Sequence, residues 1–532
     1  MSVAPVDAGF VDSVDRATGK VVARIAATDP ADLPPYFARA RLAQKAWAAK
    51  AVRERCVFLR RLGRVAFERR AEIVDAISGE TGKPRAEATF AEILLVLDTI
   101  EFVAKRAPGW LRPVRVPHHN LVMKAKSAWI EYEPYGVLAI ISPWNYPFSI
   151  PMLEIVAGLA AGNAVVLKPS EMTPGTGQLI GELVRAAGFP DGLLQVAQGG
   201  GEVGAALIGS EAVGAARPDK VFFTGSIETG RRIAEACGRA LIPSVLELGG
   251  NDAMIVLADA NLETASSAAV WGGMMNCGQA CVSVERIYVE QPVAQKFADL
   301  CAEKAGRLRV GPPSDVRSDI GPMIGSQQIS RVEEKVSEAV ELGAQVMVGG
   351  HRRREAGNNF YEPTVVTGAN HSMRLMTEET FGPVIAIEAV ASSDEAIERA
   401  NASKYGLSAS VWTGDRKRGR KIASRLAAGA VMVNDVASYF GISEAPHGGQ
   451  RASGWGRSHS RLGVMETVQV KYVDMDRLPG VAKPWWFGYG ESLAKAADRY
   501  VEFAFAPSPL RKLRALTGKD SALRTIFRRN RV

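Results

Sequence analysis

The stretch GVLAIISPWNYPFSIPMLEIVAGLAAGNAVVLKPSE, residues 136–171, predicts the fold of the chain. It contains two short apolar runs, GVLAI and AVVLK, separated by a segment long enough for a helix. Continuous apolar runs of this length are typical of strands that are buried on both faces of a parallel sheet. We therefore expect a parallel α/β layer, with functional loops just outside the carboxyl ends of its strands.

Similar runs recur along the chain and extend this interpretation. DKVFFTGS, SVLELGG and AMIVLAD follow the first pair, and a second series begins near residue 284 with VERIYVE, QVMVGG, GPVIAIEAV, SASVWTG and GAVMVND. The second series predicts a second α/β domain that shares a cleft with the first, with a boundary near residue 248. A return segment after residue 440 is expected to rejoin the first domain or to pair with another subunit.

Composition limits the function classes. The chain has 532 residues, 47% hydrophobic and 23% charged, which is typical of a globular protein with two or three domains. Apolar positions recur at helical spacing over residues 36–107, and Gly82 is placed to end a helix. The sequence has no membrane-spanning stretch and no signal peptide, and its five cysteines are typical of reduced thiols. We expect a cytoplasmic protein.

The net charge of +8 is concentrated at one end of the chain. Residues 479–532 contain eleven Lys and Arg against four Asp and Glu, so these residues carry +7 of the net charge of +8. The rest of the chain is almost neutral, and the sequence has no aromatic and basic module of the kind that binds nucleic acid. We expect no nucleic-acid partner.

Three motifs at expected strand ends could bind a substrate or a cofactor. Asn145 lies between two prolines, where a fixed side-chain amide could donate to an oxyanion, although the segment could equally be a rigid turn. Lys168 and Glu171 of LKPSE could hold ribose hydroxyls or form a solvated loop. Gly225 and Ser226 of FTGSIETG could present backbone amides to a pyrophosphate or simply cap a helix.

Two further motifs could carry the chemistry. Glu247 of LELGGND has apolar neighbours, which tend to raise a carboxyl pKa and suit a general base, although a structural carboxylate is the alternative. NCGQACVS places Cys277 and Cys281 one helical turn apart. A thiol near free backbone amides can act as a nucleophile, but the spacing does not choose between the two cysteines.

Other patterns carry little functional signal. GGGEVG at 199–204 matches Gly-x-Gly-x-x-Gly, which is a weak pyrophosphate signal on its own. GETGKP at 79–84 lacks the spacing of a phosphate-binding loop and is interpreted as a helix end. The six histidines form no metal-binding spacing, so we expect no metal.

Taken together, the motifs PWNYP, KPSE, FTGS, ELGG, GQAC and EETFGPV resemble those of the aldehyde dehydrogenase superfamily, in the same order. The resemblance extends from about DRATGKVV at 15–22 to VQVKYV at 468–473. It implies that Cys281, which ends GQAC, is the nucleophile. Cys277 is then expected to be a packing residue that could form an inhibitory disulfide with Cys281 under oxidation.

The resemblance also implies roles for the other motif residues. Asn145 should donate to the oxyanion together with the backbone N–H of Cys281, and Glu247 should activate the hydrolytic water. Lys168, Ser170 and Glu171 should bind the adenosine ribose. The remaining cofactor contacts implied are Trp144, Gly225 and Ser226 at the pyrophosphate, Glu379 at the nicotinamide ribose and Phe381 beside the nicotinamide ring.

The implied fold has a Rossmann-type NAD-binding domain, an α/β catalytic domain and a small oligomerisation element. The expected boundaries are 1–248 for the NAD-binding domain with oligomerisation strands near 123–141, 249–440 for the catalytic domain, 441–478 for the return segment and 479–532 for a C-terminal extension. The implied assembly is a homodimer or homotetramer.

The implied reaction oxidises an aldehyde to a carboxylic acid through a thiohemiacetal and a thioester on Cys281, with hydride transfer to a nicotinamide. The reduced cofactor must move before water attacks, so some looseness of nicotinamide binding is expected. Glu171 would repel the 2′-phosphate of NADP, which Lys168 could partly offset, so NAD is favoured and NADP stays an alternative. A non-catalytic protein on the same fold is the competing class.

Several positions depart from the family pattern. Asn251 stands where the family often has lysine, the Pro-Phe-Gly-Gly-x-Lys segment reads PHGGQR with His447 and Arg451, and GRS at 456–458 replaces Gly-Arg-Glu. Semialdehyde oxidisers of the family typically carry two arginines where this chain has Leu153 and Met275. We therefore expect an apolar tunnel for aliphatic or aromatic aldehydes, with a semialdehyde or amino-aldehyde as the alternative.

The C-terminal extension lies outside the family core. It combines Trp485, Trp486, Phe487 and Tyr489 with alternating apolar and basic residues over 508–532. Such segments can lie on an anionic bilayer, as the membrane-anchoring ends of some lipid-aldehyde oxidisers do, which would place the chain at the inner face of a membrane. Packing over a neighbouring subunit is the alternative.

Overall fold

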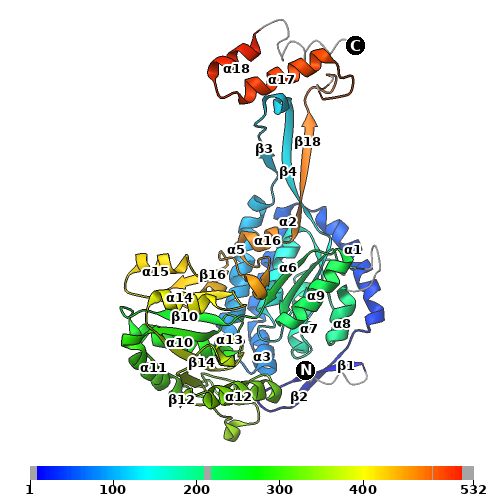
Figure 1. Ribbon diagram of the computed structural model, residues 1–532. Coiled ribbons are helices and arrows are strands. Elements are labelled where there is room, and N and C mark those ends of the chain that lie inside the picture. The colour runs from blue at the N-terminus through cyan, green and yellow to red at the C-terminus, as the bar shows by residue number, and fades with distance from the viewer. Residues whose placement is uncertain (1–8, 209–216, 482, 484, 518–532) are drawn as a thin grey trace. The chain divides into compact units, whose positions relative to one another are not determined.

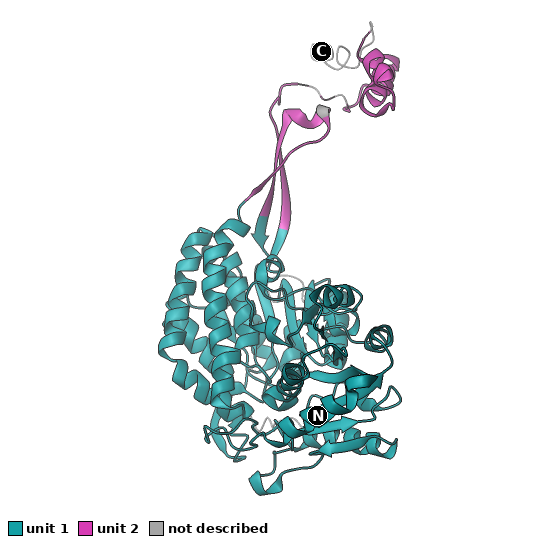
Figure 2. Ribbon diagram, turned by 90° about the vertical axis from the view of Figure 1, so that its left-hand side faces the viewer, with its two compact units in different colours: residues 1–112, 132–469 teal, residues 113–131, 470–532 magenta. Residues whose placement is uncertain are grey.

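The chain folds into two compact units, which the computed structural model describes over residues 9–208, 217–481, 483 and 485–517. The two units, coloured separately in Figure 2, comprise residues 1–112 with 132–469 (unit 1) and residues 113–131 with 470–532 (unit 2). Unit 1 contains both large sheets and every candidate site residue.

A six-stranded sheet carries the first series of strands in the order β17-β9-β8-β5-β6-β7, with only β17 antiparallel. Its strands are β5 (Val137–Ile141), β6 (Ala164–Lys168), β7 (Leu194–Val196), β8 (Lys220–Gly225), β9 (Ser244–Leu248) and β17 (Gly454–Trp455). The chain runs from β5 outward to β6 and β7 and then returns to β8 on the other side of β5. This reversal creates a switch point between β5 and β8, the place where open α/β sheets bind ligands.

Helices connect these strands. They are α6 (Ser149–Ala161), α7 (Pro174–Ala186), α8 (Gly201–Ile208) and α9 (Ile227–Ala240), all labelled in Figure 1. A further helix, α16 (Ser460–Met465), follows β17 and leads to the three-stranded sheet. Every residue of α6 is buried, because this apolar helix lies between the strands β5 and β6 and the helix α5. The position of α6 fixes the turn that precedes it, which contains Asn145.

The N-terminal segment adds a strand pair and a layer of helices. The elements are β1 (Phe10–Val14), β2 (Val21–Ala26), α1 (Leu33–Ala48), α2 (Val52–Glu68), α3 (Arg70–Thr81), α4 (Arg85–Ala88) and α5 (Leu95–Trp110), with a π-helical turn at Thr89–Leu94. The expected helix end at Gly82 is confirmed, since Gly82 has a left-handed φ of 81° directly after α3.

A seven-stranded sheet carries the second series in the order β12-β13-β14-β11-β10-β15-β16, parallel except for the β12–β13 pair. Its strands are β10 (Asp252–Val256), β11 (Val284–Glu290), β12 (Gln345–Val348), β13 (Thr364–Thr367), β14 (Val384–Val390), β15 (Ser408–Trp412) and β16 (Ala430–Val433). Its helices are α10 (Leu262–Met274), α11 (Gln291–Gly306), α12 (Ser326–Glu341), α13 (Arg374–Thr377), α14 (Ser393–Asn401) and α15 (Arg416–Ala423). The expected boundary near residue 248 falls between β9 and β10, and the predicted α/β class is confirmed.

Unit 2 contains a three-stranded sheet, in the order β18-β4-β3, and two helices. The elements are β3 (Val114–Val116), β4 (Lys126–Pro134), β18 (Val468–Asp476), α17 (Glu491–Phe505) and α18 (Pro509–Leu516), with β4 and β18 continuing into unit 1. The strand range expected near 123–141 was too wide, because β5 belongs to the six-stranded sheet, whose buried apolar pattern it shares.

The helical spacing expected over 508–532 is present in α18, and residues 518–532 lie outside the described part of the chain. Within the described residues, no helix is long and apolar enough to cross a membrane.

Candidate active site

The sheet order of unit 1 brings the first group of candidate residues together. Asn145 follows β5, Lys168 ends β6, and Ser226 follows β8, and these three strands are neighbours in one parallel sheet. Their carboxyl ends therefore share one edge of the sheet, at the switch point. Glu247 is the fourth residue of β9, the next strand along.

Cys281 is the accessible thiol. All five cysteines are free and lie in the described residues, and four of them are buried, including Cys277 at 2% exposure, while Cys281 is partly exposed. Asn276 and Cys277 both adopt left-handed backbone angles, with φ of 50° and 55°, in a turn that ends α10 and precedes Cys281. Cys277 packs in the core of the seven-stranded sheet, as expected for a packing residue.

Burial raises the pKa of the Cys281 thiol, and the nearby carboxyls of Glu379, Asp252 and Glu247 raise it further. Each of these carboxyls disfavours a second negative charge beside it. The thiolate therefore has to be stabilised by groups that donate hydrogen bonds or carry positive charge.

Asn145 is held against the turn that carries Cys281. Its Nδ2 donates to the carbonyl oxygen of Gln279 at 3.0 Å, and its own carbonyl oxygen accepts from Asn276 Nδ2 at 3.0 Å. An amide nitrogen has a second N–H, so this arrangement leaves a donor of fixed position near the thiol. Such a donor suits an oxyanion hole.

A buried ion pair that sequence reasoning missed supports Asn145. Lys83 Nζ lies 2.6 Å from Glu92 Oε1, donates to the carbonyl oxygen of Asn145 at 3.1 Å and lies 3.8 Å from the ring centroid of Tyr146. Glu92 in turn accepts the backbone N–H groups of Phe148 and Ser149 at the start of α6. The motif GETGKP, interpreted as a helix end, therefore also contributes a buried cation to the site.

Glu247 faces a cavity that also receives Cys281. The cavity has a volume of about 300 Å³, counted with its opening to solvent, and is lined by Ile150, Leu153, Glu154, Thr224, Glu247, Cys281, Phe440, His447, Ser458 and His459. Burial, with a smaller contribution from Glu154, raises the pKa of Glu247 well above its usual value. The raised pKa makes the ionised form of this carboxyl a stronger base, which can accept a proton from water.

Apolar and aromatic side chains form the surroundings of Cys281. A cluster of Tyr146, Ile150, Ala280, Val282, Leu407, Ala437 and Tyr439 packs there, and Met275, Phe440 and Cys281 itself contact it. None of the residues that line the cavity is Lys or Arg. The chain has no cation at Leu153 or Met275, and no other residue of the cavity lining supplies one.

The residues expected at the adenosine end lie at the ends of β6 and β8. Lys168, with 4% exposure, donates from Nζ to the Pro169 carbonyl at 2.9 Å and lies 3.4 Å from Glu171 Oε2. Ser170 Oγ accepts the backbone N–H of Met172 at 3.2 Å.

The residues expected at the pyrophosphate form a second group. Ser226 caps α9, where its Oγ accepts the N–H of Thr229 at 3.3 Å. The buried hydroxyl of Thr224 has no hydrogen-bond partner in the described residues, and a Cβ at Gly225 would lie 2.6 Å from the Phe223 ring. Thr224 lines the cavity that holds Cys281, whereas Ser226 lies at the positive end of α9, a position that fits a phosphate group of a dinucleotide.

Glu379 and Phe381 lie in the loop between α13 and β14 and contact residues in the loops that follow β9 and β5. Glu379 Oε1 accepts the N–H of Gly250 at 3.1 Å, and burial raises the pKa of Glu379 to about 8. Phe381, with a φ of 51°, stacks edge to face with Trp144 at a centroid distance of 5.5 Å. Glu285, which sequence reasoning did not single out, holds this turn by accepting the N–H groups of Thr380 and Phe381.

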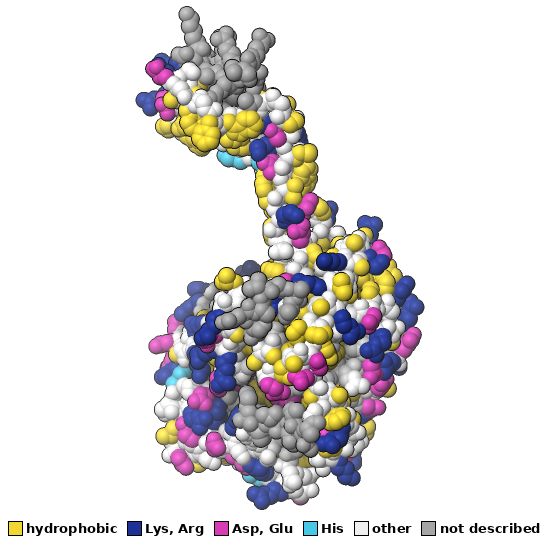
Figure 3. Space-filling view, turned by 90° about the vertical axis from the view of Figure 1, so that its right-hand side faces the viewer, with side chains coloured by type: hydrophobic (Ala, Val, Ile, Leu, Met, Phe, Trp, Pro, Cys, Tyr) yellow, Lys and Arg dark blue, Asp and Glu magenta, His cyan; other side chains and the backbone are white. Residues whose placement is uncertain are grey.

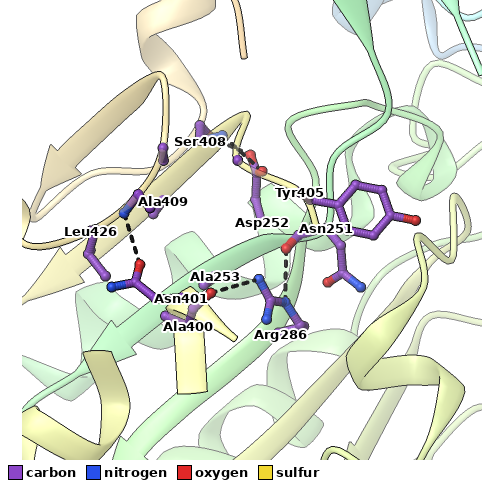
Figure 4. Close-up of a pocket in the computed structure, with 13 residues that line it drawn as sticks. Asn251, Asp252, Ala253, Arg286, Ala400, Asn401, Tyr405, Ser408, Ala409 and Leu426 are labelled. Carbon is purple, nitrogen blue, oxygen red and sulfur yellow. Dashed lines mark hydrogen bonds between the residues drawn. The ribbon is translucent and has the colours of Figure 1, made fainter. Parts of the chain in front are cut away.

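Figure 4 shows a second pocket, beside the turn 249–252, with a volume of about 270 Å³. Asp252 binds the backbone and hydroxyl of Ser408, and Arg286 donates to the carbonyl oxygens of Asn251 and Ala400. These contacts fix the start of β10, and with it the Gly249–Gly250 segment that touches Glu379 and Cys281.

GGGEVG links a strand to a helix, since Gly201 begins α8 soon after β7, and a Cβ at Gly204 would lie 3.4 Å from Lys168 Cδ. Its proximity to Lys168 leaves the weak cofactor interpretation open. No group of three or more His, Cys, Asp or Glu side chains in the described part of the chain is arranged to hold a metal ion.

The fold and the site fit a dinucleotide-dependent enzyme with an accessible cysteine in its cavity, and comparison with known proteins identifies the family. Residues 4–473 match the model described as "Aldehyde dehydrogenase family". The chain belongs to this family and is an NAD(P)-dependent enzyme that oxidises an aldehyde.

Individual relatives agree with this assignment. A protein of Methylomonas sp named 4,4'-diapolycopene aldehyde oxidase is 38% identical over 497 residues, 93% of this chain and 91% of the relative. A protein of Mycolicibacterium smegmatis, provisionally named succinate-semialdehyde dehydrogenase with NADP(+), is 39% identical over 469 residues, 88% of this chain and 89% of the relative. The crystal structure of a Mycobacterium tuberculosis aldehyde dehydrogenase complexed with NAD+ superposes with a TM-score of 0.83 at 32% identity, covering 88% of this chain and 95% of that chain.

Proposed function

We propose that this enzyme oxidises an uncharged, hydrophobic aldehyde to the carboxylic acid, with Cys281 as nucleophile and NAD as the preferred cofactor. The observation that carries the proposal is the cavity in which the accessible thiol of Cys281 and the buried carboxyl of Glu247 meet among apolar side chains. The cavity supplies a nucleophile, a base and a binding surface in one place.

In the proposed reaction, the sulfur of Cys281 attacks the aldehyde carbonyl, and Asn145 Nδ2 with the backbone N–H of Cys281 stabilises the oxyanion. When bound, the nicotinamide dinucleotide accepts the two electrons that leave the substrate carbon. The carbon is then held as a thioester on Cys281. Glu247 takes a proton from a water molecule, and the resulting hydroxide attacks the thioester. The acid is released, and the leaving sulfur of Cys281 regains the proton from Glu247.

The electrostatics of the cavity favour an uncharged substrate. Two carboxyl side chains, Glu154 and Glu247, line the cavity without a lining Lys or Arg. A substrate carboxylate would be desolvated there with no cation in the cavity lining to pair with, which costs several kcal/mol. The relative named for 4,4'-diapolycopene aldehyde supports this substrate class, whereas the relative named for succinate semialdehyde favours the alternative.

Substrate profiling tests the proposal. Formation of reduced nicotinamide is measured with hexanal, decanal, benzaldehyde and succinic semialdehyde, and we expect the first three to be favoured. Leu153→Arg adds a cation to the cavity wall and should raise kcat/KM for succinic semialdehyde at the expense of hexanal, while Leu153→Met serves as the neutral control. Activity restricted to succinic semialdehyde in the unmodified enzyme would refute the proposed substrate class.

Glu171 supports the preference for NAD. Its carboxylate lies beside the buried ammonium of Lys168, at the strand end where the adenosine ribose is expected. A 2′-phosphate would meet the charge of Glu171 at close range. We expect kcat/KM for NAD to exceed that for NADP by about tenfold, which corresponds to about 1.4 kcal/mol. Parallel titration with the two cofactors measures the ratio.

We also propose that unit 2 makes the chain a homo-oligomer. β18 is an edge strand of the three-stranded sheet and exposes Val470, Tyr472 and Met475. Exposed apolar edge strands pair with other chains. Light scattering on a size-exclusion column should give a dimer or tetramer, and Val470→Asp with Tyr472→Lys should give monomers.

For the C-terminal extension we propose contact with an anionic bilayer. Unit 2 contains sixteen Lys and Arg against seven Asp and Glu. Its exposed apolar side chains include Trp485, Trp486, Phe487, Tyr489, Leu510 and Leu513. Figure 3 shows hydrophobic side chains gathered on one face of this unit. Basic segments with aromatic anchors bind anionic lipid surfaces.

Cosedimentation tests the bilayer contact. The full chain should bind vesicles that contain phosphatidylserine and should bind weakly to phosphatidylcholine vesicles, and removal of residues 479–532 should abolish binding. An oligomer that dissociates on this truncation, without vesicle binding by the full chain, would show instead that a neighbouring subunit covers the extension.

A further inference from the structure

His447 occupies a position beside the candidate general base. It lies in PHGGQR, one of the departures from the family pattern, and lines the cavity together with Glu247. The backbone of His447 forms an antiparallel bridge with Ser458, with N–H to O distances of 2.9 and 2.8 Å. In the chain, β17 lies between these two residues. It pairs with β9, and in this pairing Gly454 is opposite Glu247. The backbone pairing of β17 with β9 and of His447 with Ser458 therefore fixes the positions of His447 and Glu247 relative to each other.

Both ring nitrogens of His447 face polar groups. Nδ1 lies 3.0 Å from the hydroxyl oxygen of Tyr439, whose ring stacks on the imidazole at a centroid distance of 5.6 Å. Nε2 lies 3.8 Å from Glu247 Oε2. Neither carboxyl oxygen of Glu247 has a hydrogen-bond partner in the described residues. A gap of this size is about 1 Å longer than a hydrogen bond, and catalytic hydrogen bonds often tighten only when substrate binds.

We propose that His447 is a positioning residue for the general base. The hydroxyl of Tyr439 donates a hydrogen bond to Nδ1, so the N–H is at Nε2 and donates a hydrogen bond to the ionised carboxylate of Glu247. A neutral imidazole has one donor and one acceptor nitrogen, so the contact at one nitrogen fixes the role of the other. A donor to the charged form of a carboxyl group stabilises that form. The donor keeps a fraction of Glu247 ionised and aims its oxygen at the water.

The surroundings agree with a neutral imidazole. Burial, with a contribution from Arg457, lowers the pKa of His447 to about 4. His459 lies 5.5 Å away, ring centroid to ring centroid, and burial lowers its pKa as well. The other charged or titratable groups that face Glu247 are Glu154, Glu466, Arg457 and Cys281. Arg457 and the backbone N–H of Ser458 favour the ionised carboxylate, but burial and the neighbouring carboxyls outweigh them, so a further donor at Nε2 of His447 would increase the ionised fraction.

The inference rests on the proposed role of Glu247, and the test uses the full-length enzyme with hexanal and NAD. His447→Phe removes the donor, and His447→Gln restores an N–H donor. Tyr439→Phe removes the hydroxyl that binds Nδ1 and leaves the imidazole of His447 in place. His351→Phe makes the same substitution at an exposed histidine and is the control. Steady-state kcat is measured from pH 6 to pH 10, and the burst of reduced nicotinamide is measured by stopped flow.

We expect His447→Phe to shift the rising limb of the kcat profile by about one pH unit to the alkaline side and to lower kcat at pH 7 about tenfold, because a hydrogen bond to a charged group is lost. The burst rate should be unchanged, because the substitution slows thioester hydrolysis and not the formation of reduced nicotinamide. His447→Gln should recover most of the loss, and Tyr439→Phe should lie between His447→Phe and the unmodified enzyme.

An unshifted pH profile in His447→Phe, or equal losses of burst and steady-state rates at every pH, would overturn the inference. If His447→Phe does not fold, Tyr439→Phe with its smaller alkaline shift decides the question. If the native enzyme reduces NAD with none of the tested aldehydes, the proposed function is refuted instead.

Discussion

Replacing Lys83 by methionine tests whether a buried ion pair supports the candidate oxyanion donor. Lys83 and Glu92 have side chains with 0% exposure and an N···O distance of 2.6 Å. Methionine retains the apolar stem but removes the charge, so the carboxylate of Glu92 stays buried without its cation. Loss of one partner from a buried pair costs about 3–5 kcal/mol. Two backbone N–H groups still bind Glu92, so we expect the lower end of this range.

The predicted loss translates into a measurable melting temperature. For 532 residues, the unfolding entropy is about 1.1 kcal/mol/K, so a loss of about 3 kcal/mol lowers the midpoint by about 3 °C. Lys50→Met is the matched control, because it breaks a pair with Glu54 of the same 2.6 Å length whose side chains are 33% and 50% exposed. Exposed pairs contribute about 0.5 kcal/mol, which corresponds to less than about 1 °C.

Activity separates a structural role from a role at the site. Lys83 also donates to the carbonyl oxygen of Asn145, so its loss frees the turn that carries the oxyanion donor. We expect kcat with hexanal to fall about tenfold, which is about 1.4 kcal/mol of transition-state stabilisation. Adding Glu92→Gln removes the unpaired charge and should restore part of the melting temperature but not kcat. A Lys83→Met enzyme that melts and turns over like the native protein would refute this reasoning.

Three further predictions concern single side chains of the site. Cys281→Ser should abolish formation of reduced nicotinamide while NAD binding, measured by calorimetry, is retained; undiminished turnover would contradict the assignment of the nucleophile. Glu171→Gln should lower the NAD-to-NADP ratio of kcat/KM about tenfold, and an unchanged ratio would place the 2′-position elsewhere. Burial raises the pKa of Glu154 from 4.5 to about 8, so the folded chain keeps a proton that the unfolded chain has released, and stability falls as pH rises between these values. Glu154→Gln should therefore raise the melting temperature more at pH 8 than at pH 5 in scanning fluorimetry, and an equal rise at both would contradict the pKa.

The strands of unit 1 could be predicted because their signal is local. Runs such as VLAII and AVVLK are buried along their whole length, which matches the uninterrupted apolar pattern of inner parallel strands. The strands of unit 2 have a weaker signal. β18 is mostly exposed and reads as ordinary surface sequence, so its pairing with β4 could not be anticipated from composition.

The candidate site divides in the same way. Residues at strand ends, such as Lys168 and Ser226, could be proposed because parallel strands gather their carboxyl ends at one edge. Lys83 and Glu285 could not, because each acts on residues that are distant in sequence, 62 positions away for Asn145 and 96 for Phe381. A lysine near a helix end and a glutamate in a strand are common, and only the fold shows which backbone groups they bind.

The link between the two sheets explains why the proposed nucleophile, Cys281, and the proposed base, Glu247, keep a fixed separation. Glu247 is the residue before the last in β9 and Asp252 begins β10, so only four residues separate Glu247 from the second sheet. Within that turn, a Cβ at Gly250 would lie 2.2 Å from the carbonyl oxygen of Cys281, and one at Gly249 would lie 2.2 Å from Glu379 Oε2. The backbone can pass between these groups only as glycine. The turn between β9 and β10 therefore lies against both Cys281 and Glu379, and the position of β10, fixed by Asp252 and Ser408, helps to set the distance between the thiol and the carboxyl of Glu247.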